Sequence, residues 1–173
     1  MQHERRSEAL RAMLESSRVS FHSLLDSLSD EDLHRRSNNP GWTNGEVLFH
    51  IVFAFMLIPK LVPLLRLWGR LPARYSRVFA HLLNGATPVF NWINAIGARG
   101  GGKIYTRDRI RMKYDRVHLS ILRKLDAIPN DEWSLGMYYP DRWDALFDEY
   151  MTLEEVFCFP MRHFAFHLKQ VSQ

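Results

Sequence analysis

The sequence contains a single cysteine, Cys158, so the chain cannot form an internal disulfide bond. Its first thirty residues carry charges throughout and lack the apolar core of a signal peptide, so we expect a cytoplasmic protein. With 173 residues, of which 46% are hydrophobic, the chain is long enough to bury one sizeable core and too short to suggest two. We therefore expect a single domain over residues 1–173.

Acidic residues are absent between Glu46 and Asp108. This interval carries eight of the 23 basic residues, which leaves the rest of the chain with fewer basic residues than its 19 acidic ones. A basic, apolar segment of this kind can face an anionic ligand, an anionic membrane surface or an acidic patch of the protein itself. No nucleic-acid-binding motif accompanies it, so we expect no nucleic-acid partner.

Apolar residues spaced three and four apart predict amphipathic helices along the chain. Two of the helix starts are marked by capping boxes, in which a Thr hydroxyl and a Glu carboxylate each accept a hydrogen bond from a free backbone amide. These boxes are formed by Thr43 with Glu46 and by Thr152 with Glu155. The long predicted helices cover residues 5–28, 43 to at least 55, 106–128 and 152–171.

The second of these helices is apolar almost all round, so it is either buried or lipid-facing. Charged residues and prolines break its apolar run, which favours a core helix over a membrane span. Pro59 and Pro63 are expected to kink or end it, because proline lacks an amide hydrogen and crowds the preceding turn. His50 lies in its middle, and a buried imidazole without a partner costs about 1 to 3 kcal/mol. We therefore expect His50 either to bond a neighbouring residue or to bind a metal ion.

His163 and His167 are four residues apart on the last predicted helix, so their imidazoles lie one above the other on one face. Two imidazoles at this spacing can bind one metal ion, although the spacing also arises by chance. A catalytic metal usually takes three protein ligands and keeps another position open, so a third ligand must come from elsewhere. Gln170 follows on the same face, where it can fix an imidazole or a bound water.

Four features form a combination that is more specific than any one of them: LSDEDL before the first turn, PGWT at the start of the second helix, His50, and FPMRHFAFHLKQV near the C-terminus. In this order they resemble the DinB/YfiT-like superfamily. The resemblance implies an all-α four-helix bundle in which His50, His163 and His167 bind a divalent metal ion, zinc or nickel in many members. Some members transfer a low-molecular-weight thiol such as bacillithiol or mycothiol, or isomerise a substrate with its help.

The chain differs from the compact family pattern by an extra helical insertion, at about residues 59–104, between the second and third long helices. Within it we expect a helix over residues 73–83, an apolar piece over 89–96 and a flexible, glycine-rich connector over 97–104. The connector resembles a phosphate-binding loop, but Ile104 replaces the hydroxyl residue that would hold magnesium. The insertion could be a lid over the site, a homodimer contact, a peripheral membrane contact or a structural elaboration without function.

Three neutral imidazoles would leave the full charge of a divalent ion in an apolar pocket. There the metal lowers the pKa of a bound water or holds a thiol as thiolate, and either product is a nucleophile at neutral pH. The thiol route matches the family and the apolar surroundings, and it predicts transfer of a low-molecular-weight thiol to a small electrophilic substrate. A metal-dependent hydrolase and a non-catalytic metal-binding or stress-response bundle are the alternatives.

Three further side chains are candidates for the neighbourhood of the site. A hydrolase would need a carboxylate base near the metal, and Glu46 is the candidate, although its capping role competes. Tyr114 on the third long helix either hangs over the site or belongs to the rim of the core. His118, one turn further along, is expected to be solvated.

Overall fold

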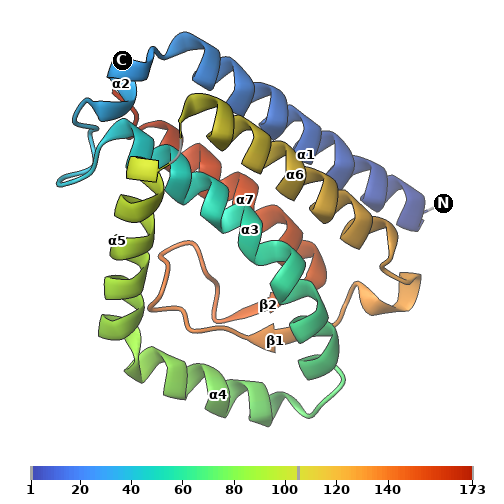
Figure 1. Cartoon of the computed structure of the whole chain (residues 1–173). Helices are drawn as coiled ribbons and strands as arrows, with labels where there is room; N and C mark the ends of the chain where they lie inside the picture. The colour runs from blue at the N-terminus through green and yellow to red at the C-terminus, as the bar shows by residue number, and fades with distance from the viewer. Residues whose placement is uncertain (1, 105, 173) are drawn as a thin grey trace.

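The structure is a computed structural model that describes residues 2–104 and 106–172. Within these ranges the chain is mostly α-helical and contains one short antiparallel hairpin (Figure 1). The fold is therefore all-α, as predicted. Its elements are α1 (Gln2–Ser27), α2 (Asp30–His34), α3 (Asn44–Trp68), α4 (Ala73–Gly85), α5 (Thr87–Ile104), α6 (Arg107–Asp126), a 3₁₀ turn (Asn130–Glu132), β1 (Gly136–Tyr138), β2 (Tyr150–Thr152) and α7 (Leu153–Leu168).

The four long helices α1, α3, α6 and α7 form the body of the molecule. Helix α3 contacts both α6 and α7, and α1 contacts the same two helices from the other side (Figure 1). Their facing sides are apolar and bury a continuous core, because each helix repeats apolar residues at the helical period. The core includes Leu14 and Phe21 of α1, Ile51 and Phe55 of α3, Ile121 of α6 and Phe157 of α7.

Both predicted capping boxes are present, and they fix the starts of the helices that carry the candidate ligands. At the start of α3, the Thr43 backbone amide donates to Glu46 Oε2 at 2.7 Å, and the Glu46 amide donates to Thr43 Oγ1 at 3.3 Å. Thr152 and Glu155 repeat this arrangement at the start of α7. Each box satisfies backbone amides that would otherwise lack a partner in the first turn.

Helix α3 is the central helix of the fold. It is the one helix in the described ranges that is long and apolar enough to cross a membrane by length and composition, yet half of its most apolar window is buried inside the protein. The sequence predicts that Pro59 and Pro63 kink or end this helix. They do not end it, because α3 continues to Trp68. The two prolines are four residues apart on one side, where Pro59 is half-buried and Pro63 is exposed.

The insertion forms two helices, α4 and α5, of which α5 is longer than predicted. The flexible connector expected at residues 97–104 is instead the second half of α5. Its glycines serve close packing, because a Cβ on Gly101 would lie 2.1 Å from the Phe49 ring and one on Gly102 would lie 2.5 Å from Glu46 Cγ. Helix α5 can therefore lie directly against the first turns of α3.

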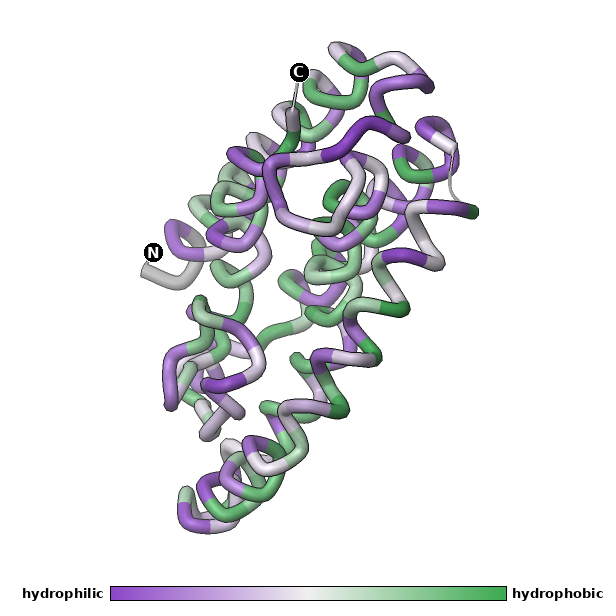
Figure 2. Tube along the Cα trace, turned by 90° about the vertical axis from the view of Figure 1, so that its left-hand side faces the viewer, coloured by the Kyte–Doolittle hydropathy of each residue, from purple (hydrophilic) through white to green (hydrophobic). Residues whose placement is uncertain are grey.

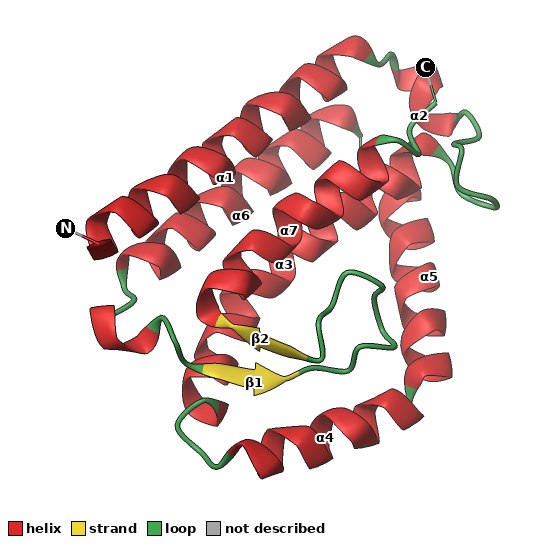
Figure 3. Cartoon of the chain, turned by 180° about the vertical axis from the view of Figure 1, so that it is seen from behind, coloured by secondary structure: helices red, strands yellow, loops and turns green. Residues whose placement is uncertain are grey.

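A 3₁₀ turn and a short hairpin connect α6 to α7. Gly136 pairs with Thr152 and Tyr138 with Tyr150 in the antiparallel register. The segment between the strands, residues 139–149, leaves the hairpin toward α5 (Figure 3). This segment brings loop side chains to the space between α3, α5 and α7.

Candidate metal centre

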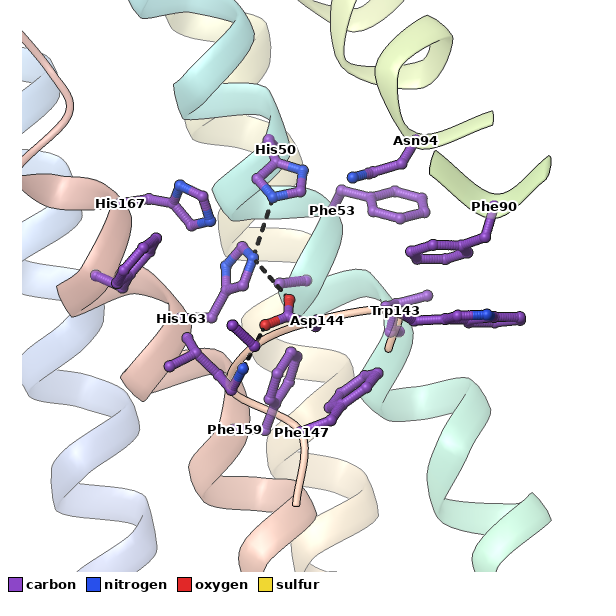
Figure 4. Close-up of a pocket in the computed structure, with 15 residues that line it drawn as sticks. His50, Phe53, Phe90, Asn94, Trp143, Asp144, Phe147, Phe159, His163 and His167 are labelled. Atoms are coloured by element: carbon purple, nitrogen blue, oxygen red, sulfur yellow. Dashed lines mark hydrogen bonds and ion pairs between the residues drawn. The ribbon is translucent and has the colours of Figure 1, made fainter. Parts of the chain in front are cut away.

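Three histidines from two helices meet in the interior. His50 comes from the second turn of α3, and His163 and His167 come from the C-terminal half of α7 (Figure 4). Nε2 of His163 lies 3.1 Å from Nε2 of His50, and the ligand atoms of all three residues lie within 4.8 Å of one another. Two nitrogens that share one tetrahedral metal ion at about 2.0–2.1 Å would lie about 3.3 Å apart, so this spacing fits a shared ion.

Burial keeps these imidazoles neutral at physiological pH. It lowers the pKa of His50 to about 3, an effect that His167 reinforces and the nearby Asn94 side chain opposes. Burial also lowers the pKa of His163 to about 2, with His50 and His167 acting in the same direction. The pKa of His167 is lowered by burial as well, against the opposing effects of Gln170 and Asp144. Only neutral imidazole has a lone pair free for a metal ion, so the site favours the form that binds.

Gln170 lies beside His167. Its Oε1 lies 2.7 Å from Nδ1 of His167 and also accepts a hydrogen bond from Asn39 Nδ2 at 3.1 Å. Because a carbonyl oxygen can only accept, Nδ1 of His167 carries the proton and Nε2 keeps its lone pair. Gln170 thus sets the tautomer that leaves Nε2 of His167 available as a ligand.

The histidines form one end of a cavity of about 220 Å³. Apolar and aromatic side chains make most of its surface, and they come from α3, α5, α7 and the segment between the two strands. The Asn94 side chain of α5 points toward His50 (Figure 4). The aromatic lining consists of Phe53, Phe90, Trp143, Phe147, Phe159 and Phe166.

Asp144 is a site residue that the sequence analysis missed. Its Oδ2 lies 3.6 Å from Nε2 of His163, the same nitrogen that faces Nε2 of His50 (Figure 4). Its Oδ1 accepts the Leu146 backbone amide at 2.8 Å, which fixes the carboxylate. Burial raises the pKa of Asp144, and the Leu146 amide opposes this. The one sequence signal was an isolated acidic residue among apolar ones, in Trp143-Asp144-Ala145-Leu146-Phe147.

The other candidates of the sequence analysis lie outside the cavity. Glu46 is one turn before His50, but its carboxylate caps α3 and does not line the cavity. Tyr114 is fully buried and stacks on Phe21 at 4.4 Å between ring centroids, so it is a core residue. The expectation that His118 is solvated is wrong: it is buried, with Nε2 3.2 Å from Glu15, because it lies beside the buried stripe of α6.

The donor set is the one expected of a metal centre with an open side. Three buried, neutral imidazoles converge on one point, and an apolar cavity that Asp144 also lines adjoins them. A helical bundle with such a site defines the class: a protein that can hold a divalent ion with positions free for a further ligand. His50, His163 and His167 would hold the ion, and the ion would supply Lewis-acid chemistry.

Comparison with known families agrees with this class. The model of the DinB superfamily matches residues 13–171, so the chain belongs to the DinB superfamily. The match spans all three histidines and the insertion. No curated protein and no solved structure is similar enough to the chain to count as a match.

Proposed function

We propose that the protein is a metal-dependent enzyme that transfers a low-molecular-weight thiol to a small, apolar electrophile. The observation that carries this proposal is the convergence of three buried, neutral histidines at the end of an aromatic cavity. A divalent ion held there would polarise a ligand and favour its deprotonated form. Zinc and nickel both suit three imidazoles, and the choice between them depends on availability in the cell.

The cavity supports a small substrate with apolar parts. Its volume of about 220 Å³ is that of a compact site, and its lining has few polar groups besides the histidines, Asn94 and Asp144. A cavity of this kind excludes water from a reactive thiolate. The aromatic side chains of Phe53, Phe90 and Trp143 would then hold the electrophile by apolar contact.

Asp144 gives the transfer a group that can move a proton. Its Oδ1 is held by the Leu146 amide, so Oδ2 is the oxygen directed at the site. In the proposed step Oδ2 takes the thiol proton, and the sulfur electron pair forms the bond to the electrophilic carbon. The displaced group leaves with the electrons of the broken bond and receives the proton from Asp144. The raised pKa of Asp144 brings it closer to neutral pH, where a carboxyl group can both accept and return a proton.

Hydrolysis at the same site is a second candidate, and Asp144 favours it. A hydrolase needs a carboxylate near the metal to accept a proton from water. Glu46 is committed to the helix cap, whereas Asp144 lies beside His163. The apolar cavity would then bind an ester or amide of low polarity.

The first experiment measures metal content by elemental analysis of protein purified without a metal-affinity tag. We expect about one ion per chain for a single three-histidine site, and loss of the ion in His50→Ala and in the double variant His163→Ala/His167→Ala. The matched control is His34→Ala, because His34 is exposed on α2, away from the three histidines. A native protein that holds no ion after incubation with zinc or nickel would refute the proposal.

The second experiment distinguishes the two reactions. The metal-loaded protein is screened with bacillithiol, mycothiol or glutathione and an aryl or alkyl electrophile, and separately with apolar esters. Thiol-dependent consumption of the electrophile supports transfer, and ester cleavage without thiol supports hydrolysis. In either case Asp144→Asn should keep the metal and lower the turnover about 100-fold or more, as expected for loss of a general base.

A further inference from the structure

The outer surface of the insertion carries an unusual number of exposed apolar side chains. More than half of the large apolar side chains that are exposed in the described part of the chain lie between residues 67 and 104. They recur three and four residues apart, so they form one stripe along each helix. Figure 2 shows the molecule from the side of α5, with α4 at the bottom. We call these stripes the outer face; it consists of Leu71 just before α4, Tyr75, Val78 and Leu82 on α4, and Val89, Trp92, Ile93 and Ile96 on α5.

The opposite sides of the two helices already hold them on the protein. Ser76 and Ala80 of α4 are buried, and the Ser76 hydroxyl accepts the Tyr138 backbone amide at 3.3 Å. On α5, Phe90 lines the cavity and stacks on Trp143 at 4.2 Å between ring centroids. The outer face is therefore not needed for packing against the bundle, and within residues 2–104 and 106–172 no segment covers it.

Basic residues accompany the outer face, and the two helices that form it contain no acidic residue of their own. The sequence has no acidic residue between Glu46 and Asp108. Lys103 lies on the same side of α5 as Ile96, two turns further along, and Arg99 lies at the edge of this stripe. Arg74 takes the same edge position on α4. All three are exposed, and neither Arg99 nor Lys103 forms an ion pair with any residue that the structure describes.

We propose that the outer face of α4 and α5 docks on the surface of an anionic lipid bilayer. Apolar side chains that include an exposed tryptophan suit the boundary between headgroups and acyl chains, and flanking Arg and Lys side chains suit anionic headgroups. Trp92 is 66% exposed in the middle of the stripe on α5. The docked surface is a helix face that lies on the bilayer, and α3 remains the core helix.

The charges favour a bilayer over a second copy of the chain. A two-fold dimer places the same patch of both subunits in contact, so Arg74, Arg99 and Lys103 would approach an equally basic surface. Neither copy offers an acidic side chain from residues 47–107 to compensate them. An anionic bilayer supplies the missing negative charge.

Docking would also bring the cavity close to the lipid. Phe90 and Asn94 face the cavity from the inner side of α5, and Trp92 and Ile93 belong to its outer face. A single helix thus separates the bilayer surface from the three histidines. If the proposed function is correct, the electrophile is a lipophilic molecule drawn from the membrane. Docking itself does not depend on that function.

The test is co-sedimentation of the full-length protein with vesicles. Vesicles of phosphatidylcholine mixed with phosphatidylglycerol are compared with vesicles of phosphatidylcholine alone. We expect binding to the mixed vesicles that weakens as salt is raised, and at least tenfold weaker binding to the neutral ones. Trp92 reports on the contact, because Trp42, Trp68, Trp133 and Trp143 are buried or half-buried and Trp92 is not. Its fluorescence should shift to shorter wavelength when the protein binds.

Two variants test the apolar and the basic side chains separately, and a third variant is the control. Trp92→Ser/Ile93→Ser should weaken binding at least tenfold on the mixed vesicles. Arg99→Glu/Lys103→Glu should weaken it similarly and reduce its salt dependence. Val19→Ser on α1 should leave binding unchanged, although Val19 and Ile93 are both 55% exposed. Circular dichroism and metal content, measured on each variant, verify that the fold and the site are intact.

Three results would overturn the proposal: no binding to mixed vesicles, equal binding to both kinds of vesicle, or a Val19→Ser effect as large as that of Trp92→Ser/Ile93→Ser. A protein that sediments as a dimer and becomes monomeric in Trp92→Ser/Ile93→Ser would assign the outer face to a second copy of the chain. The vesicle assay needs neither metal nor substrate. Failure of docking and failure of the proposed function are therefore separate results.

Discussion

The side-chain oxygen of Gln170 lies 2.7 Å from Nδ1 of His167 and accepts a second hydrogen bond from Asn39. Gln170→Ala removes the acceptor that holds this imidazole in the ligand tautomer. We expect metal affinity to fall about 10- to 100-fold, the usual effect of losing such a partner. Competition with a chromophoric zinc chelator measures the affinity. Gln170→Glu, which retains an acceptor, should restore most of it, and unchanged affinity in Gln170→Ala would mean that His167 is not a ligand.

The glycines of α5 offer a matched pair of variants. Gly101→Ala places a Cβ 2.1 Å from the Phe49 ring, whereas a Cβ at Gly100 meets nothing within 4 Å. We expect Gly101→Ala to lower the free energy of unfolding by about 1–3 kcal/mol through overpacking. Gly100→Ala should raise it by about 0.5–1 kcal/mol, because alanine favours the helix. Urea unfolding of both variants measures the difference, and equal effects would contradict the close packing of α5 on α3.

Tyr114 has a buried hydroxyl without a hydrogen-bond partner among the described residues. Burial raises the pKa of this phenol. Tyr114→Phe removes an unsatisfied polar group and keeps the ring stacked on Phe21, so we expect the free energy of unfolding to rise by about 1 kcal/mol. Metal content should stay the same, because Tyr114 does not line the cavity. A loss of metal in this variant would instead support the alternative in which Tyr114 lies over the site.

The depressed histidine pKa values predict an acid-sensitive metal-free protein. In the unfolded chain His50 and His163 titrate near pH 6.5, but in the folded protein their pKa values are about 3 and about 2. Above about pH 6.5 the two imidazoles are neutral in both the folded and the unfolded state, so they do not lower the free energy of unfolding. As the pH falls below this value, the unfolded state binds protons that the folded state does not, which costs about 1.4 kcal/mol per pH unit for each histidine.

Urea unfolding in a chelator between about pH 7 and about pH 5 measures this dependence. His163→Phe should flatten the slope, because it removes one of the two strongest contributions. His34→Ala is the control, because His34 is exposed on α2. A free energy of unfolding that does not change with pH would contradict this prediction, because it would show that the imidazoles are protonated in the folded state without loss of stability.

Much of the fold was predictable because local chemistry determines it. The Thr43 and Thr152 caps satisfy amides within their own first turns, so the sequence is sufficient to place the starts of α3 and α7. The spacing of His163 and His167 is likewise a property of one helix. His50 was identified from a single polar residue in an apolar helix, and the family resemblance joined it to the pair.

The features that the sequence does not predict correctly are mostly those that depend on contacts between distant segments. The glycine content of residues 97–104 predicts a flexible connector, but Gly101 and Gly102 are needed where α5 lies against Phe49 and Glu46. Asp144 reaches the site only because the β1–β2 segment returns toward α7, and no local pattern encodes that path. His118 could have been placed correctly, because it follows Val117 and lies one turn after Tyr114 on the buried side of α6.

The candidate metal ligands and much of the cavity wall come from different parts of the chain. His50, His163 and His167 come from α3 and α7, in the bundle core. Much of the wall comes from α5 and the β1–β2 segment, through residues such as Phe90 and Trp143. Substitutions in the wall can alter which molecules enter while the ligand helices stay unchanged. Under the proposed function, this arrangement would let the substrate preference change during evolution without a change in the three metal ligands.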